Sequence, residues 1–113
     1  MHVALPFPPS VNTYWRTFRG RMIISAKGRE YRQHVCKLLE GCERMTGRLS
    51  LMVELFPPDR RRRDIDNSLK ALLDGLGHGG AYDDDSQIKL LQVAMMEPTE
   101  GGEAVVKIER MGA

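Results

Sequence analysis

Two apolar stripes with the same spacing limit the folds open to this chain. In each stripe, apolar residues recur at relative positions 0, 4, 7, 8 and 11, which is the spacing of one face of an α-helix. The run between the stripes, residues 49–55, alternates large apolar side chains with others, as a half-buried strand does. The chain is therefore expected to pack helices on a sheet. The stripes are Tyr31, Val35, Leu38, Leu39 and Cys42, and Ile65, Leu69, Leu72, Leu73 and Leu76.

Local signals place the ends of these helices. Ser25 is a suitable N-cap for the first helix, which is expected to end between Gly41 and Thr46. The second helix is expected to begin between Asp64 and Asn67 and to end near Gly77. Four more strands are expected: Val3–Leu5, a short one at Met22–Ile24, a central one at Ile88–Met96, and Ala104–Met111. This order predicts an α+β fold, a single domain over residues 1–113 with a mixed β-sheet and two main helices packed on it.

Composition narrows the class of protein. With 113 residues, 42% apolar and 28% charged, the chain is expected to form one globular domain. No apolar run approaches the roughly 20 residues that cross a bilayer, so we expect a cytoplasmic protein with no membrane partner. Cys36 and Cys42 match no zinc or redox spacing and are expected to be reduced thiols. The three histidines are scattered, which argues against a histidine metal site or a Ser/His/Asp triad.

Charge is divided unevenly along the chain. Residues 1–63 hold 13 Lys and Arg against 5 acids, whereas residues 64–113 hold 4 against 10. Such asymmetry favours a nucleic-acid partner without settling it. The boundary lies inside the run Arg60–Asp66, where four arginines meet two aspartates.

Asp64 and Asp66 lie where a strand has ended and a helix begins. In extended chain, side chains two positions apart point the same way, so the two carboxylates can share one ion. Mg²⁺ prefers oxygen ligands and usually takes one or two protein carboxylates, with water and phosphate oxygens completing its shell. The alternative is structural, with Asp64 capping the helix and Asp66 complementing its dipole.

A second acidic cluster, Asp83 to Asp85, follows a glycine-rich loop. By itself it is typical of a solvated turn, but a bound cation would relieve the mutual repulsion. Lys70 lies four residues after Asp66 and four before Asp74. It therefore either belongs to an exposed ladder of alternating charge or serves as a point cation that faces a scissile phosphate.

The arginine run comprises Arg60, Arg61, Arg62 and Arg63. It is either a soluble loop or a phosphate-binding segment, and its position beside the candidate metal ligands favours the second, because arginine forks pair bidentately with phosphate oxygens. Further cations precede or open the first helix, among them Arg21 and Lys27, and they are expected to contact the phosphates of a nucleic acid. Tyr14 and Trp15 are interleaved with them and either stack on bases or pack in the core.

These residues together resemble the RusA family of Holliday-junction resolvases, the crossover junction endodeoxyribonucleases. The resemblance spans nearly the whole chain. It rests on Asp59–Asn67 with Lys70, Asp74 and Leu76, on Asp84–Ile88, and, nearer the front, on Leu5–Tyr14, Gly20-Arg21, Ser25–Gly28 and Tyr31-Arg32. Asp83 departs from the pattern, since the family commonly has an apolar residue there.

The resemblance implies a homodimeric, Mg²⁺-dependent endonuclease that cuts four-way junction DNA by paired symmetric nicks in recombination and repair. It implies that Asp64, Asp66 and Asp85 are catalytic metal ligands and that Lys70 is the catalytic cation. Asp84 and Asn67 become candidates for supporting the ligands. Action on DNA would place the protein at the nucleoid.

Two alternatives remain at this point. One is a metal-dependent nuclease with the same ligands that acts on another branched or single-stranded DNA. The other is a non-catalytic basic DNA-binding protein, in which the carboxylates serve only as caps and ion-pair partners. Asp64, Asp66 and Asp85 discriminate between them, because only an enzyme requires these carboxylates for cleavage.

Overall fold

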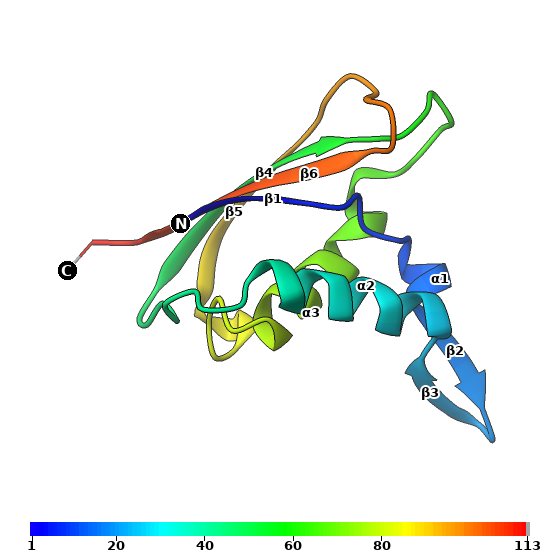
Figure 1. Ribbon diagram of the computed structural model, residues 1–113, viewed down its shortest axis with the longest axis horizontal. Coiled ribbons are helices and arrows are strands. Elements are labelled where there is room, and N and C mark those ends of the chain that lie inside the picture. The colour runs from blue at the N-terminus through cyan, green and yellow to red at the C-terminus, as the bar shows by residue number, and fades with distance from the viewer. Residues whose placement is uncertain (113) are drawn as a thin grey trace.

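The computed structural model describes residues 1–112, and they form a mixed four-stranded sheet with helices on one face (Figure 1). The strands lie in the order β1-β6-β4-β5, in which β4 pairs with β5 in parallel and the other neighbours are antiparallel. The predicted α+β fold with a mixed sheet is confirmed. The strands are β1 (His2–Leu5), β4 (Leu49–Phe56), β5 (Ile88–Met95) and β6 (Glu103–Arg110).

Two main helices, α2 (Ala26–Leu38) and α3 (Leu69–His78), pack against each other and cover the sheet. Ser25 caps α2 as predicted, since its hydroxyl accepts a hydrogen bond from the Gly28 amide at 3.0 Å. The second helical stretch begins with a 3₁₀ turn, η1 (Ile65–Ser68), which leads directly into α3. The predicted start between residues 64 and 67 is therefore correct.

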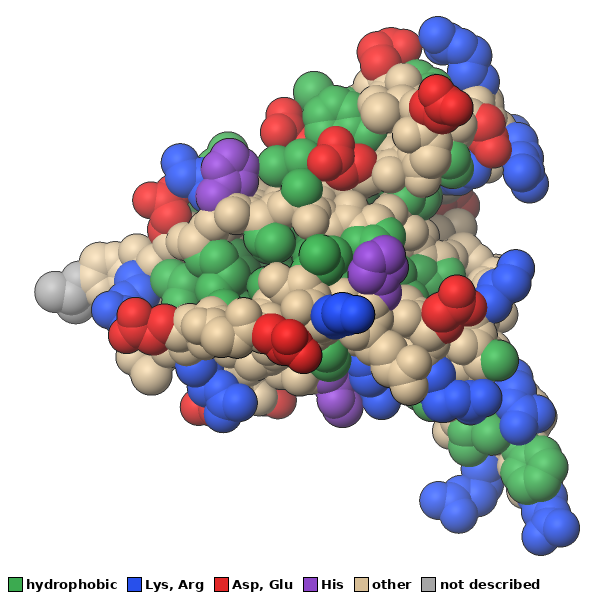
Figure 2. Space-filling view, viewed as in Figure 1, with side chains coloured by type: hydrophobic (Ala, Val, Ile, Leu, Met, Phe, Trp, Pro, Cys, Tyr) green, Lys and Arg blue, Asp and Glu red, His purple; other side chains and the backbone are tan. Residues whose placement is uncertain are grey.

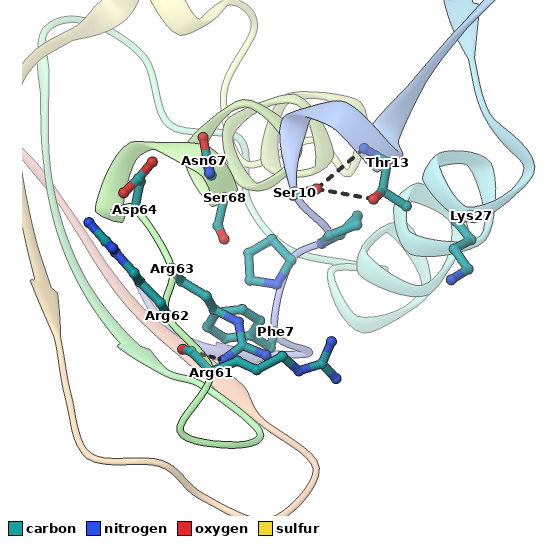
Figure 3. A pocket seen from close by; sticks show the side chains of 12 residues that line it. Phe7, Ser10, Thr13, Lys27, Arg61, Arg62, Arg63, Asp64, Asn67 and Ser68 are labelled. Carbon is teal, nitrogen blue, oxygen red and sulfur yellow. Dashed lines mark hydrogen bonds between the residues drawn. The ribbon is translucent and has the colours of Figure 1, made fainter.

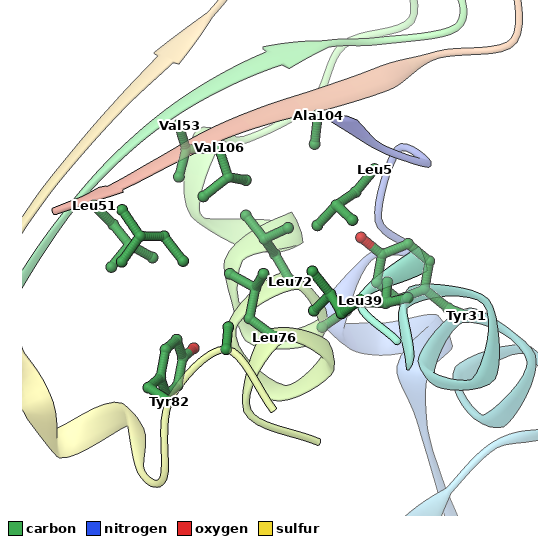
Figure 4. Packing of buried hydrophobic residues seen from close by; sticks show 14 of the residues in the cluster. Leu5, Tyr31, Leu39, Leu51, Val53, Leu72, Leu76, Tyr82, Ala104 and Val106 are labelled. Carbon is green, nitrogen blue, oxygen red and sulfur yellow. The ribbon is translucent and has the colours of Figure 1, made fainter. Parts of the chain in front are cut away.

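The core lies between the sheet and these helices, and it contains most of the residues that the periodicity selected (Figure 4). Leu38 and Ile65, one from each predicted stripe, are exceptions, since they are 48% and 44% exposed. Along β4, buried and more exposed residues alternate, which turns one face of the strand toward the helices. On the other face of the sheet, Met52 is 48% and Leu90 46% exposed. Members of the core include Leu5, Tyr31, Val35, Leu51, Val53, Leu72, Leu76, Tyr82, Val106 and Ile108.

The expectation that residues 88–96 form a central strand is wrong, because β5 is the edge of the sheet. It pairs only with β4, and β6 takes the place between β1 and β4. The apolar composition of β5 indicated a buried strand, but Leu90 and Leu91 are exposed at this edge of the sheet.

The chain between β1 and α2 forms a small projecting unit that the sequence revealed only in part. Its second strand contains the predicted residues 22–24, whereas its other two elements were not predicted. The unit consists of α1 (Val11–Tyr14), β2 (Trp15–Phe18) and β3 (Arg21–Ile24). A last 3₁₀ turn, η2 (Asp85–Gln87), precedes β5.

Both cysteines are free thiols, as expected. Over residues 1–112, each helix is too short or too polar to cross a bilayer.

Candidate functional site

The arginine run lies in the loop between β4 and η1, and Asp59 organises its backbone. The Asp59 carboxylate accepts hydrogen bonds from the Arg61 amide at 2.9 Å and from Nη1 of Arg63 at 2.8 Å. These bonds, with that of Arg63 the stronger influence, lower the pKa of Asp59 to about 2. The Arg63 guanidinium also lies 5.6 Å from the centre of the Phe7 ring, a cation–π contact. Arg63 therefore holds the loop against the body of the protein.

The other arginines of the run remain available to a ligand. Arg60 reaches only an exposed Glu97, at 3.5 Å, and Arg61 lies 3.4 Å from Asp59 with 83% of its side chain exposed. Arg62 forms no ion pair with any residue of the described range. Exposed pairs of this kind stabilise a protein by at most about 1 kcal/mol, so a phosphate can displace them.

A cavity of about 630 Å³ opens beside this loop (Figure 3). Its wall combines three of the predicted DNA-binding arginines with Lys27 from the first turn of α2, and with the predicted metal ligand Asp64. Asn67, a predicted supporting residue, also lines it. The lining residues are Phe7, Pro8, Pro9, Ser10, Thr13, Lys27, Arg61, Arg62, Arg63, Asp64, Asn67 and Ser68.

Asp64 does not act as a helix cap. Its backbone is extended, with φ −83° and ψ 137°, and its side chain makes no capping hydrogen bond to η1. Asp66 follows in the first turn of η1 and Lys70 in the first turn of α3, and both are exposed. This arrangement leaves the Asp64 carboxylate free to face a ligand in the cavity.

The seven aspartates of the chain divide into two groups. Four bind other parts of the protein: Asp59 binds Arg61 and Arg63, Asp74 binds Tyr14 and Arg32, Asp83 binds Arg44, and Asp84 binds the Ser86 amide. Within residues 1–112, the side chains of the other three form no hydrogen bond or ion pair. These three are Asp64, Asp66 and Asp85, the predicted ligands.

Asp84 has a structural role. Its carboxylate accepts a hydrogen bond from the Ser86 amide at 3.0 Å, which lowers the pKa of Asp84. Gln87 completes a capping box, because its amide oxygen accepts from the Asp84 amide at 3.1 Å. The sequence contains the signal for this cap, an Asp followed three residues later by Gln.

Asp85 lies apart from the cavity that Asp64 lines. It borders a second hollow, of about 400 Å³, which is built on the second half of α3 with Leu73, Asp74 and Tyr82. Over residues 1–112, no three His, Cys, Asp or Glu side chains are grouped closely enough to hold one metal ion. The structure thus brings Asp64 together with the basic residues but does not gather all three predicted ligands.

The exposed charge ladder considered for α3 does not form. Asp74 is half-buried and turns toward α2, where its Oδ2 accepts from Arg32 at 2.8 Å and from the Tyr14 hydroxyl. Lys70 has no ion-pair partner among the described residues. Burial raises the pKa of Asp74, but the bonds from Tyr14 and Arg32 outweigh it and hold this pKa below its ordinary value. Sequence reasoning missed this cluster because its members lie 18 and 42 residues apart.

Tyr14 is a core residue and not a base-stacking one. It is fully buried, and burial together with the bond to Asp74 raises its pKa to about 12. Arg21 lies on β3, outside the residues that line the cavity, and is exposed.

The arginines and the lysine of this cavity suit an anionic ligand such as a nucleic-acid phosphate. The sequence model of the family described as endodeoxyribonuclease RusA matches residues 6–109. The chain is 41% identical over 114 residues to a crossover junction endodeoxyribonuclease rusA of Enterobacteria phage 82, covering 98% of this chain and 95% of the relative. The chain therefore belongs to the RusA family of endodeoxyribonucleases.

Two further relatives have the same printed name. The protein of Escherichia coli strain K12 is 39% identical over 113 residues, covering 97% of this chain and 94% of that one. The protein of Enterobacteria phage HK97 is 40% identical, covering 95% of this chain and 92% of that one. The match therefore extends over the fold as a whole, beyond the site alone.

Proposed function

We propose that this chain is a Mg²⁺-dependent endodeoxyribonuclease that resolves four-way DNA junctions by paired, symmetric nicks. The observation that carries the proposal is the position of an unpaired carboxylate, Asp64, in the wall of a cavity that Arg61, Arg62 and Lys27 also line. Such a cavity attracts a DNA phosphate and places a metal ligand beside it. The names of the RusA relatives, crossover junction endodeoxyribonucleases, agree with this reading.

The metal is assigned to Asp64 and Asp66. Asp85, which borders a separate hollow, is proposed as a third ligand only on the resemblance to the RusA family. The donor set suits Mg²⁺, because all three are carboxylates without a partner in the described chain, whereas the remaining aspartates are held by other groups. Two protein carboxylates are enough for Mg²⁺, since water and phosphate oxygens complete its shell. When bound, the ion supplies a Lewis acid that neutralises phosphate charge and activates water.

The other site residues act on the substrate directly. Arg61 and Arg62 are exposed and are assigned to contacts with phosphate oxygens on either side of the cleaved bond. Arg63 fixes the loop through Asp59 and Phe7, so that these contacts are presented in one geometry. Lys70, free of ion pairs in the described range, stabilises the charge that develops on the phosphate.

A homodimer follows from the reaction. A four-way junction needs one nick on each of two opposed strands, and one subunit of this family offers one site, so a two-fold dimer supplies both. The sheet face away from the helices, with Met52 and Leu90 exposed, provides apolar surface for such an interface. Light scattering of the protein bound to junction DNA checks this, and one subunit per junction would contradict it.

The test compares Asp66→Asn with Asp83→Asn. Both changes remove one exposed carboxylate, but Asp83 belongs to an exposed ion pair with Arg44 at 2.7 Å. With a synthetic junction labelled on all four strands, wild type and Asp83→Asn are expected to nick two opposed strands in Mg²⁺ and none in EDTA. Asp66→Asn is expected to bind the junction and to lose cleavage by a factor of at least about 100.

Three outcomes would overturn the proposal in different ways. Cleavage by Asp66→Asn at the wild-type rate excludes this residue as a ligand. Binding of DNA without cleavage by any variant, wild type included, identifies a non-catalytic binding protein. Cleavage of flaps or single strands in preference to intact junctions identifies a nuclease of different substrate class.

A further inference from the structure

A basic hairpin projects from the body of the protein and lies outside the proposed cleavage site (Figure 1). We call residues 15–24, which comprise β2, β3 and their turn, the hairpin arm. The two strands pair only with each other, in a register that sets Trp15 opposite Ile24 and Phe18 opposite Arg21. A two-stranded ribbon without a supporting layer is marginally stable by itself, so its persistence depends on how its root is held.

The root of the hairpin arm is firmly attached. The Tyr14 carbonyl accepts the Ser25 amide at 2.8 Å, and the Ser25 hydroxyl donates to the Thr13 carbonyl at 2.5 Å, which closes the ribbon at its base. Trp15 and Ile24 are half-buried and pack against the core. Tyr14 is fully buried and bonded to Asp74 of α3.

The tip of the hairpin arm presents an aromatic ring between two cations. Phe18 is 48% exposed, and the guanidinium groups of Arg16 and Arg19 lie 5.4 Å and 5.3 Å from the centre of its ring. Arg19 has φ +52° and Gly20 φ +74°, so the turn that follows Phe18 is tight. An exposed aromatic ring at the end of a projecting element is unusual unless it contacts a partner.

Charge identifies the chemistry of that partner. The hairpin arm contains Arg16, Arg19 and Arg21 and no acidic residue, and the first acid in the whole chain is Glu30. None of these three arginines forms an ion pair with another part of the described chain. In the space-filling view, Lys and Arg side chains crowd this projection with the hydrophobic tip among them (Figure 2). A polyanion with flat apolar surfaces, a nucleic acid with accessible bases, matches this combination.

We propose that the hairpin arm reads the branch point of the DNA: the guanidinium groups of Arg16 and Arg19 leave the Phe18 ring for adjacent phosphates, and the ring stacks on a base there. The inference rests on the proposed function and extends it, because it assigns junction recognition to an element outside the cleavage site. Bases at a branch point are less firmly stacked than bases within a duplex, so an aromatic side chain contacts them at low cost. The ring then contributes to binding of junctions and not of continuous duplex.

The experiment compares Phe18→Ala with Met22→Ala. Met22 is the matched control, because it lies in the same ribbon, is 66% exposed, and is paired with Thr17, so its side chain leaves the opposite face. Binding is measured in EDTA by fluorescence anisotropy with a labelled four-way junction and a linear duplex of the same sequence. Base unstacking is followed with 2-aminopurine placed at the branch point.

Phe18→Ala is expected to weaken junction binding by at least about fivefold, to leave duplex binding within about twofold, and to lose the 2-aminopurine response. Met22→Ala is expected to match wild type, and Phe18→Trp to restore junction binding. Equal junction affinity of Phe18→Ala and Met22→Ala would overturn the inference, as would equal losses on junction and duplex.

Three outcomes distinguish this inference from the proposed function and from a contact between subunits. If wild type nicks junctions in Mg²⁺ while Phe18→Ala binds them unchanged, only the hairpin arm proposal fails. If wild type neither prefers nor nicks junctions, the proposed function fails and takes this inference with it. If light scattering shows a dimer for wild type and a monomer for Phe18→Ala, the tip contacts a second subunit and the base-stacking assignment is wrong.

Discussion

Replacing Gly28 by alanine tests the attachment of the hairpin arm. Gly28 lies in the first turn of α2, and a Cβ there would come within 2.5 Å of the Tyr14 carbonyl oxygen and 2.7 Å of the Ile24 Cγ1. The carbonyl cannot retreat easily, because it accepts the Ser25 amide and belongs to a fully buried residue. The substitution therefore forces α2 and the root of the arm apart.

The magnitude follows from two opposing effects. Extra volume in a tightly packed place costs about 1 to 3 kcal/mol, whereas alanine favours a helix over glycine by up to about 1 kcal/mol. The free energy of unfolding should therefore fall by up to about 2 kcal/mol. For a chain of 113 residues the unfolding entropy makes this a decrease of up to about 8 °C in Tm.

The assay is thermal and urea unfolding followed by circular dichroism, with Gly77→Ala as control. Gly77 also lies in a helix, but its Cβ would meet only Tyr82 Cε1 at an ordinary 3.5 Å. Gly77→Ala should therefore raise the free energy of unfolding by about 0.5 to 1 kcal/mol. Equal stability of the two variants would refute the reasoning, since it would mean that the close approach to Tyr14 is relieved without cost.

Four further substitutions test other contacts. The pKa of Asp74 is lower in the folded protein than in the unfolded chain. The ionised carboxylate therefore stabilises the folded protein at pH values above the unfolded pKa. This stabilisation is lost as the pH falls through the folded pKa. When urea unfolding is measured from pH 7 to pH 2, Asp74→Asn should have a lower free energy of unfolding than wild type at pH 7. On acidification, this free energy should fall less for the variant than for wild type. Ser25→Ala should lower the free energy of unfolding by about 1 kcal/mol, because it removes the cap of α2. Arg63→Ala should lower both stability and DNA affinity, whereas Arg62→Ala should leave Tm unchanged and reduce the log-log salt slope of duplex binding by about 0.9.

Each of these expectations has a contrary result. An Asp74→Asn variant with the acid sensitivity of wild type would mean that the carboxylate is not stabilised by Tyr14 and Arg32. An unchanged Tm for Ser25→Ala would show that water replaces its hydroxyl without loss. Equal Tm values for Arg63→Ala and Arg62→Ala would remove the loop-fixing role of Arg63.

Most of the fold could be predicted from the sequence, because side chains that face the core recur at a regular spacing along each helix and strand. The stripes and the alternation in β4 follow most of the side chains that face the core, so both main helices and this strand were predicted. The predicted end of the first helix, between Gly41 and Thr46, was wrong, because α2 already ends at Leu38. The position of β5 was not accessible in that way. Strand order depends on which neighbours pair, and the apolar residues of an exposed edge resemble those of a central strand.

The candidate site was predictable in its residue types more than in its geometry. The arginine run and Asp64 meet in one cavity because they are neighbours in the chain. The distance of Asp85 from that cavity depends on how η2 sits against α3, which no local pattern encodes. The first strand of the hairpin arm was not predicted for a related reason, since three of the four residues of β2 are exposed and leave no period to detect.

The bond between Tyr14 and Asp74 joins the root of the hairpin arm to α3, the helix that carries Lys70. One phenol and one carboxylate therefore fasten the base of the arm directly to this helix. Because Tyr14 is fully buried, the orientation of the arm relative to α3 is set inside the protein and not at its surface.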